Sequence, residues 1–114
     1  MWWHDNGQKS GEGNFKNDKK DGVFTNWHDN GQKQLEVKYK HGKKEGLELT
    51  WYENGQKLAE LNYKDDKREG LAMIWHENGL KAGESNWRDG KKVSAKYWNS
   101  KGEPVDSREE AEAE

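Results

Sequence analysis

Three histidines occupy one position of a 24-residue period, and a row of imidazoles raises the question of a metal site. His4, His28 and His76 share this position, and Tyr52 takes it in the remaining copy. A metal ion needs several ligands that converge on one point. Because these side chains belong to separate repeats and Tyr52 interrupts the row, we expect neither a metal site nor any other cofactor. The chain has no cysteine, which excludes cysteine-based metal sites and a thiolate nucleophile.

Carboxylates are the other abundant groups that could do chemistry. They recur as columns of identical residues, of which the clearest is Glu12, Glu36, Glu60 and Glu84. General acid–base catalysis needs distinct residues that converge in one pocket and whose environments separate their pKa values. A repeated glutamate is instead typical of a solvated surface, so we expect that the protein is not an enzyme.

Aromatic side chains form two further columns, half a period apart. Only 29% of the residues are hydrophobic, 37% are charged and the mean hydropathy is −1.53, a balance that would favour disorder without these rings. The rings either pack as a core along the sheet or line a groove that binds a partner, and both roles remain open. The candidate protein-binding face consists of Trp27, Tyr39, Trp51, Tyr63, Trp75 and Trp87.

Basic pairs recur in the links between the aromatic segments and predict a stripe along one edge, where phosphate groups of acidic lipids could bind. The alternative is a solvated rim that Asp21, Glu45 and Glu69 neutralise. We expect no nucleic acid partner, because base stacking needs basic residues interleaved with the rings and these pairs lie on the links. The candidate anion-binding residues are Lys43, Lys44, Lys67, Arg68, Lys91 and Lys92.

The element that positions every column is a repeated heptapeptide. It reads WHDNGQK at 3–9 and 27–33, WYENGQK at 51–57 and WHENGLK at 75–81. A fixed period of this length indicates a repeat architecture, and Asn-Gly between alternating residues predicts a β-hairpin. An isolated hairpin is marginal in water. We therefore predict an all-β fold in which the hairpins stack into a single antiparallel sheet.

The hairpin register decides which residues share a face. A two-residue loop would place Leu49 opposite Glu60 and mix charge into the apolar face. A three-residue loop, residues 53–55 with Gly55 in the left-handed region, keeps the apolar residues together. Since a one-residue slip moves every side chain to the other face, we predict the three-residue loop. On this register Leu47, Leu49 and Trp51 share one face with Lys57, Ala59, Leu61 and Tyr63.

The string YKHGKKEGLELTWYENGQK at 39–57 resembles the MORN repeat, and specifically the bacterial variant labelled YwqK-family antitoxins. The resemblance spans residues 2 to about 103. It implies a single-sheet, MORN-like solenoid of hairpins. It also implies a scaffold or protein-binding role, an antitoxin-like function in the bacterial variant, and binding of acidic phospholipids in some eukaryotic members.

The repeats divide the chain into one domain, 1–105, and an acidic tail, 106–114. The hairpin units are about 1–21 (partial), 22–45, 46–69, 70–93 and a cap at 94–105. Strand residues equivalent to 47–50 are missing before Trp2 and Trp3, which leaves an open sheet edge or a chain cut from something longer. An open edge invites a partner strand and makes a homodimer possible.

The tail holds five acidic residues and one basic residue, against a net charge of −2 for the whole chain. We expect it to be disordered, with folding back onto the basic stripe as the alternative. No apolar run is long enough for a signal peptide or a membrane span, so we expect a cytoplasmic location.

Together these observations predict a non-enzymatic repeat scaffold that binds a protein partner, with an antitoxin-like role implied by the resemblance. Two alternatives remain open. One is binding of acidic phospholipid at a membrane surface through the lysine-rich stripe, and the other is self-association through the N-terminal edge.

Overall fold

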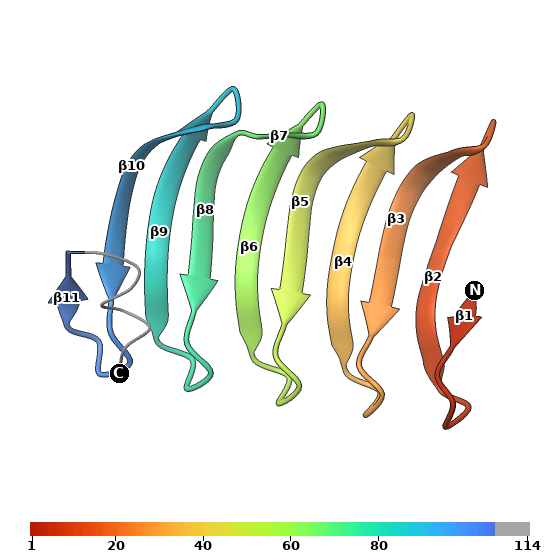
Figure 1. Ribbon diagram of the computed structural model, residues 1–114, viewed down its shortest axis with the longest axis horizontal. Helices are drawn as coiled ribbons and strands as arrows, with labels where there is room; N and C mark the ends of the chain where they lie inside the picture. The colour runs from red at the N-terminus through yellow and green to blue at the C-terminus, as the bar shows by residue number, and fades with distance from the viewer. Residues whose placement is uncertain (107–114) are drawn as a thin grey trace.

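The computed structural model describes residues 1–106, which form one open antiparallel sheet (Figure 1). Neighbouring strands follow one another along the chain, except that the short β7 continues into β8. This confirms the predicted all-β sheet of stacked hairpins. The strands are β1 (Trp2–Trp3), β2 (Lys9–Lys16), β3 (Lys19–Trp27), β4 (Lys33–Lys40), β5 (Lys43–Trp51), β6 (Lys57–Lys64), β7 (Lys67–Arg68), β8 (Gly70–Trp75), β9 (Lys81–Arg88), β10 (Lys91–Trp98) and β11 (Pro104–Val105).

Neither face of the sheet is covered by a helix or a second sheet within residues 1–106. The same residues contain no helix long and apolar enough to cross a membrane. The acidic tail lies outside the described residues, apart from Asp106.

Two kinds of turn alternate along the sheet. At the Asn-Gly corners, Tyr52 N donates to Gln56 O at 2.8 Å, and Gly55 has φ 88°. This is the predicted three-residue loop with a left-handed glycine. At the other edge, two-residue turns with positive φ at both positions join the hairpins, as at His41 and Gly42. Such turns match the strand twist.

The predicted single apolar face is wrong. Trp51 pairs with Lys57 as expected, but Thr50 pairs with Ala59, because Leu58 is an extra residue in β6. This β-bulge shifts the register by one. Leu49 therefore lies opposite Glu60, the pairing that the prediction had rejected. The same shift recurs beside Trp27 and Trp75.

The bulges distribute the two aromatic columns over opposite faces of the sheet. Tyr63 pairs with Gly46 and Leu61 with Glu48, on the face opposite to Leu47, Leu49 and Trp51. We call the two surfaces the tyrosine face and the tryptophan face. The tyrosine face carries Tyr39, Tyr63, Trp87 and Tyr97, and the tryptophan face carries Trp27, Trp51, Trp75 and Trp98.

The small core lies mainly on the tyrosine face, where Phe24, Val37, Ala59 and Ala72 are buried. Ala82, the extra residue at the bulge in β9, is also buried. Around Phe24 the rings of Trp2, Phe15 and Tyr39 lie at centroid distances of 6.5, 5.5 and 5.3 Å. A Cβ on Gly13 would lie 2.3 Å from the Phe24 ring, so only glycine allows this close approach. Towards the C-terminal end smaller residues take the corresponding places, with Ala72 two repeats after Phe24 and Gly83 two repeats after Leu35.

Candidate binding surface

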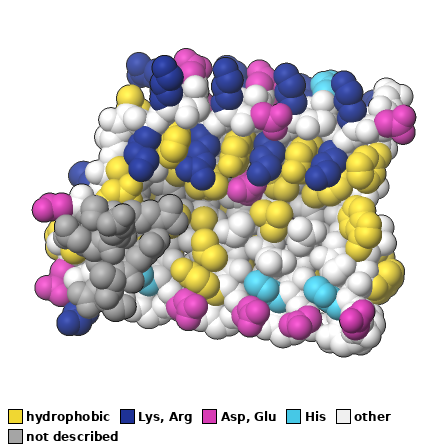
Figure 2. Space-filling model, in the orientation of Figure 1, with side chains coloured by type: hydrophobic (Ala, Val, Ile, Leu, Met, Phe, Trp, Pro, Cys, Tyr) yellow, Lys and Arg dark blue, Asp and Glu magenta, His cyan; other side chains and the backbone are white. Residues whose placement is uncertain are grey.

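On the tyrosine face, rings and cations alternate across the strands. We call this set the ring row; it consists of Lys20, Tyr39, Lys44, Tyr63, Arg68, Trp87 and Lys92. Tyr39 pairs with Lys44 and Tyr63 with Arg68, so the hairpin register places each cation between two rings. Figure 2 shows this as a row in which basic and hydrophobic side chains alternate. Equivalent residues lie two strands apart, about 10 Å.

Each cation of this row lies over an aromatic ring. Lys20 Nζ is 4.8 Å from the centroid of Tyr39, and Lys44 Nζ is 4.9 Å from that of Tyr63. Arg68 Cζ is 4.6 Å from the Trp87 centroid, with Lys92 Nζ at 5.9 Å from the same ring. Cation–π contacts of this kind contribute about 0.5–2 kcal/mol.

The candidate anion-binding residues therefore do not form one stripe. Lys44, Arg68 and Lys92 belong to the ring row, which corrects the expectation that basic residues lie only on the links and not between rings. Lys43, Lys67 and Lys91 are exposed beside the two-residue turns. A second row of basic side chains at that edge is visible in Figure 2.

The tryptophan face has its own cations, but carboxylates neutralise them. Lys33 Nζ lies 5.8 Å from the Trp51 centroid and 2.7 Å from Glu36 Oε2, and this arrangement repeats along the face. The glutamate column expected as a surface ladder thus forms ion pairs with the preceding lysine. These pairs are partly exposed, so each is worth at most about 1 kcal/mol. The pairs are Lys9–Glu12, Lys33–Glu36, Lys57–Glu60 and Lys81–Glu84.

Charges on the tyrosine face are not balanced in this way. Within residues 1–106, Lys44 is the only cation of the ring row that forms an ion pair, with Glu48 at 2.5 Å. Glu48 is buried, with 7% of its surface exposed. Burial lowers the pKa of Lys44, but the hydrogen bond and charge of Glu48 outweigh it and raise the pKa overall. Phe24 and Ala72 occupy the position of Glu48 in the neighbouring repeats.

A hollow of about 180 Å³ opens around Ala72 at the C-terminal end of this face. Its floor is formed by Ala59, Ala72 and Gly83, and Arg68, Trp87 and Lys92 stand beside it. Trp87 Nε1 donates to Ser85 Oγ at 2.8 Å, and Lys92 Nζ donates to the Tyr97 hydroxyl at 2.9 Å, so both side chains are held in place.

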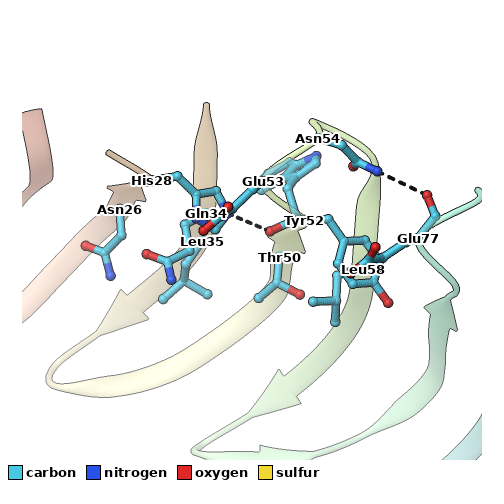
Figure 3. A pocket seen from close by; sticks show the side chains of 11 residues that line it. Asn26, His28, Gln34, Leu35, Thr50, Tyr52, Glu53, Asn54, Leu58 and Glu77 are labelled. Carbon is cyan, nitrogen blue, oxygen red and sulfur yellow. Dashed lines mark hydrogen bonds between the residues drawn. The ribbon is translucent and has the colours of Figure 1, made fainter. Parts of the chain in front are cut away.

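A larger hollow, about 660 Å³, lies near the Asn-Gly corners (Figure 3). Its lining mixes polar side chains such as His28, Thr50 and Tyr52 with Leu35 and Leu58. Thr50 Oγ1 is buried and has no hydrogen-bond partner among the described residues. Three other polar side chains of the lining bind carbonyls of the protein itself: His28, Tyr52 and Asn54, the last with the Glu77 carbonyl at 3.1 Å.

The histidine column joins neighbouring repeats. The Nε2 of His28 lies 2.9 Å from the Trp51 carbonyl, and the Tyr52 hydroxyl donates to the Trp75 carbonyl at 2.6 Å. A tyrosine can therefore replace the histidine, because both carry a donor to the same carbonyl position. Within the described part of the chain, no three histidine or carboxylate side chains gather where they could hold a metal ion.

The N-terminal edge exposes aromatic side chains. β1 pairs only with the first residues of β2, at Lys9 and Gly11. The exposed fractions are 47% for Trp2, 61% for Trp3 and 57% for Phe15. This places the largest exposed rings of the described chain at the edge for which self-association is predicted.

Sequence reasoning missed Lys20, Glu48, Ala72 and Tyr97 as members of the tyrosine face. The four-residue spacing of Lys44 and Glu48 is visible in the sequence, but it indicates an ion pair only once both residues are known to lie on one face.

Comparison with known proteins adds a family assignment. A family model described as the MORN repeat variant matches residues 1–17, 20–41 and 44–65, together more than half of the chain. The second and third segments begin 24 residues apart, in agreement with the internal period. No curated protein matches the chain.

Proposed function

The chain belongs to the MORN repeat variant family, and on that premise we propose that it is a scaffold that binds a protein partner through the tyrosine face. The family is a non-catalytic repeat family, and MORN repeats are generally associated with binding and scaffold roles. The proposal adds two points to this general role: the partner is a protein, and it binds to the tyrosine face.

The observation that carries the proposal is the combination of rings, a hollow and unbalanced cations on one face that no other described element covers. Lys20, Arg68 and Lys92 lie over rings and form no ion pair within residues 1–106. Hollowed apolar surfaces with a few polar groups are typical binding sites. On the tryptophan face, by contrast, each lysine over a ring already has a glutamate.

Of the six aromatic residues predicted to bind a partner, Tyr39, Tyr63 and Trp87 remain in the proposed site. Trp27, Trp51 and Trp75 lie on the other face and serve as a comparison surface. The resemblance to the bacterial variant supports an antitoxin-like form of the proposal, in which the bound protein is a toxin held inactive.

The test is affinity capture from a lysate of the source organism, at low and at high salt, with mass spectrometry. The Tyr63→Ala variant removes a ring from the tyrosine face, and Trp51→Ala is its matched control on the other face. We expect one protein to be retained at high salt by the wild type and by Trp51→Ala, and lost from Tyr63→Ala. Equal retention by both variants would place the binding surface elsewhere. Thermal unfolding must show that both variants are folded.

Binding of acidic phospholipid is a second candidate, favoured by the exposed edge row of Lys43, Lys67 and Lys91. Lys44 contributes little to it, because its charge is matched by Glu48. Binding to phosphatidylserine vesicles that falls steeply with salt and is lost when the three edge lysines are changed to glutamine would favour this candidate.

Self-association is a third candidate, favoured by the exposed rings of Trp2, Trp3 and Phe15. It predicts a dimer in light scattering that dissociates when Trp2 is replaced by a charged residue. A monomer at all protein concentrations would remove this candidate.

A further inference from the structure

We propose that Arg68, Trp87 and Lys92 form a carboxylate-binding site, which takes a glutamate or aspartate side chain from an extended acidic segment of the protein partner. This inference rests on the proposed function and adds the chemistry of the partner. It concerns the C-terminal half of the tyrosine face, where the floor is formed by Ala72 and its neighbours.

The chain itself shows how a carboxylate sits in the ring row. In the central repeat, Lys44 lies over Tyr63 and binds Glu48, four residues later, at 2.5 Å. The carboxylate is buried beside Leu61, which is paired with Glu48 across β5 and β6. The row therefore accommodates a carboxylate next to a ring-bound cation.

The next repeat keeps the cation and lacks the carboxylate. Arg68 takes the place of Lys44 over the Trp87 ring, at 4.6 Å, and Ala72 takes the place of Glu48. The missing side chain leaves a hollow of about 180 Å³ around Ala72, Leu61 and Ser85. A carboxylate supplied from outside would occupy the position that Glu48 occupies one repeat earlier.

The cations beside the hollow are available for such a ligand. Across residues 1–106, neither Arg68 nor Lys92 forms an ion pair, and Lys92 donates to the Tyr97 hydroxyl. A guanidinium can grip a carboxylate with two parallel hydrogen bonds. The one acidic residue at the hollow, Glu84, binds Lys81 at 3.1 Å. No described side chain therefore competes for Arg68.

The lining of the hollow favours an amino-acid side chain over a phosphate group. Leu58, Leu61 and Ile74 line it together with the alanines, and they can pack against the aliphatic stem of a glutamate. A phosphate has no such stem and would leave the apolar lining exposed. Within residues 1–106 no other element covers the face beside the hollow, so an extended segment can lie across it.

The test uses the full chain and a fluorescent eight-residue peptide in which glutamate and valine alternate, with glutamine replacing glutamate in the control peptide. Binding is measured by fluorescence anisotropy. Arg68→Gln removes the proposed guanidinium, and Lys67→Gln removes one charge from the neighbouring exposed residue. Ala72→Glu should recreate the pair of the preceding repeat and fill the site from within.

We expect Arg68→Gln and Ala72→Glu each to weaken binding of the acidic peptide by about tenfold or more, and Lys67→Gln by no more than about twofold. The affinity of the wild type for the glutamine peptide should be no higher than the affinity of the Arg68→Gln variant for the acidic peptide. If Ala72→Glu does not fold, the affinities of Arg68→Gln and Lys67→Gln for the acidic peptide still show whether Arg68 holds the carboxylate. Equal binding by these two variants, or equal binding of both peptides, overturns the proposal.

Other occupants give different results. Displacement of the peptide by inorganic phosphate at equal concentration, or Arg68-dependent binding to phosphatidylserine vesicles, would assign the site to phosphate groups. Peptide binding that appears only after deletion of residues 107–114 would assign it to the acidic segment of the chain itself. Each of these results would overturn the proposal that an acidic segment of a partner protein occupies the site. A captured protein that is lost from Tyr63→Ala but retained by Arg68→Gln would leave the proposed function intact and remove only this site.

Discussion

Lys44 and Glu48 form an ion pair in the middle of the tyrosine face, where Phe24 stands one repeat earlier and Ala72 one repeat later. The Nζ–Oε1 distance is 2.5 Å, and Glu48 is the only buried charged residue among residues 1–106. Removing one member of a buried pair leaves the other without a partner, whereas replacing both by apolar residues is often neutral or stabilising. We therefore expect a variant that removes Lys44 alone to be less stable than the wild type, and a variant that replaces both residues to keep most of the stability.

We expect Lys44→Met to lower the free energy of unfolding by about 1–3 kcal/mol, because it leaves the Glu48 carboxylate buried and unpaired. The double variant Lys44→Met with Glu48→Leu should recover most of this loss. Urea unfolding at pH 7 of the wild type, both single variants and the double variant measures the coupling. A double variant less stable than Lys44→Met would contradict this account.

The same pair predicts a loss of stability at alkaline pH. The pKa of Lys44 is raised above its ordinary value of 10.5: burial lowers it, but the hydrogen bond and charge of Glu48 raise it by more. A raised pKa stabilises the folded protein below the unfolded pKa, and this contribution disappears as pH rises through the folded value. The contribution of Lys44 to the free energy of unfolding should therefore be lost above about pH 10.5.

The measurement is urea unfolding between about pH 9 and about pH 12. Alkaline pH affects the rest of the chain as well, so the comparison that matters is with the double variant at positions 44 and 48. The wild type should lose more free energy of unfolding across this range than the double variant does. Parallel curves for the two proteins would rule out a contribution from Lys44.

Tyr52 offers a test of the bonds that join the repeats. Its hydroxyl donates to the Trp75 carbonyl at 2.6 Å, as His28 Nε2 does to Trp51 at 2.9 Å. We expect Tyr52→Phe to lower the free energy of unfolding by about 0.5–1.5 kcal/mol. Tyr52→His should be closer to the wild type, because histidine makes the equivalent bond in the other repeats. A histidine variant no more stable than the phenylalanine variant would show that the hydrogen bond is not what position 52 contributes.

The repeat, the hairpins and the corner loop were predictable because each depends on local chemistry. Gly55 adopts φ 88°, as a three-residue loop ending in Asn-Gly requires. The faces were not predictable, because Leu58 is an extra residue in the strand and a β-bulge has no fixed residue type. That one residue moves Tyr63 to the face opposite Trp51, so the six rings predicted to form one binding face lie on two faces.

The directions of the basic side chains could not be predicted from the sequence either. The links were recognised from Lys43 and Lys44 together, but alternation along β5 sends the two side chains in different directions. Lys44 then contacts Glu48 and Tyr63, an arrangement that depends on the register between β5 and β6. Arg68, which forms no ion pair among residues 1–106, and the hollow at Ala72 follow from the same register. Both become visible only when neighbouring repeats are compared in space.

The close approach of Gly13 to Phe24 gives the last prediction, on how the core is held. A Cβ on Gly13 would lie 2.3 Å from the Phe24 ring, so Gly13→Ala should cost about 1–3 kcal/mol through overpacking. Phe24→Ala should cost about 3–5 kcal/mol, because it removes the ring around which Trp2, Phe15 and Tyr39 pack. The double variant should lose less than the sum of the two, since the clash at residue 13 exists only while the ring is present. A double-mutant cycle by urea unfolding measures this difference, and strict additivity would contradict the clash between a side chain at residue 13 and the Phe24 ring.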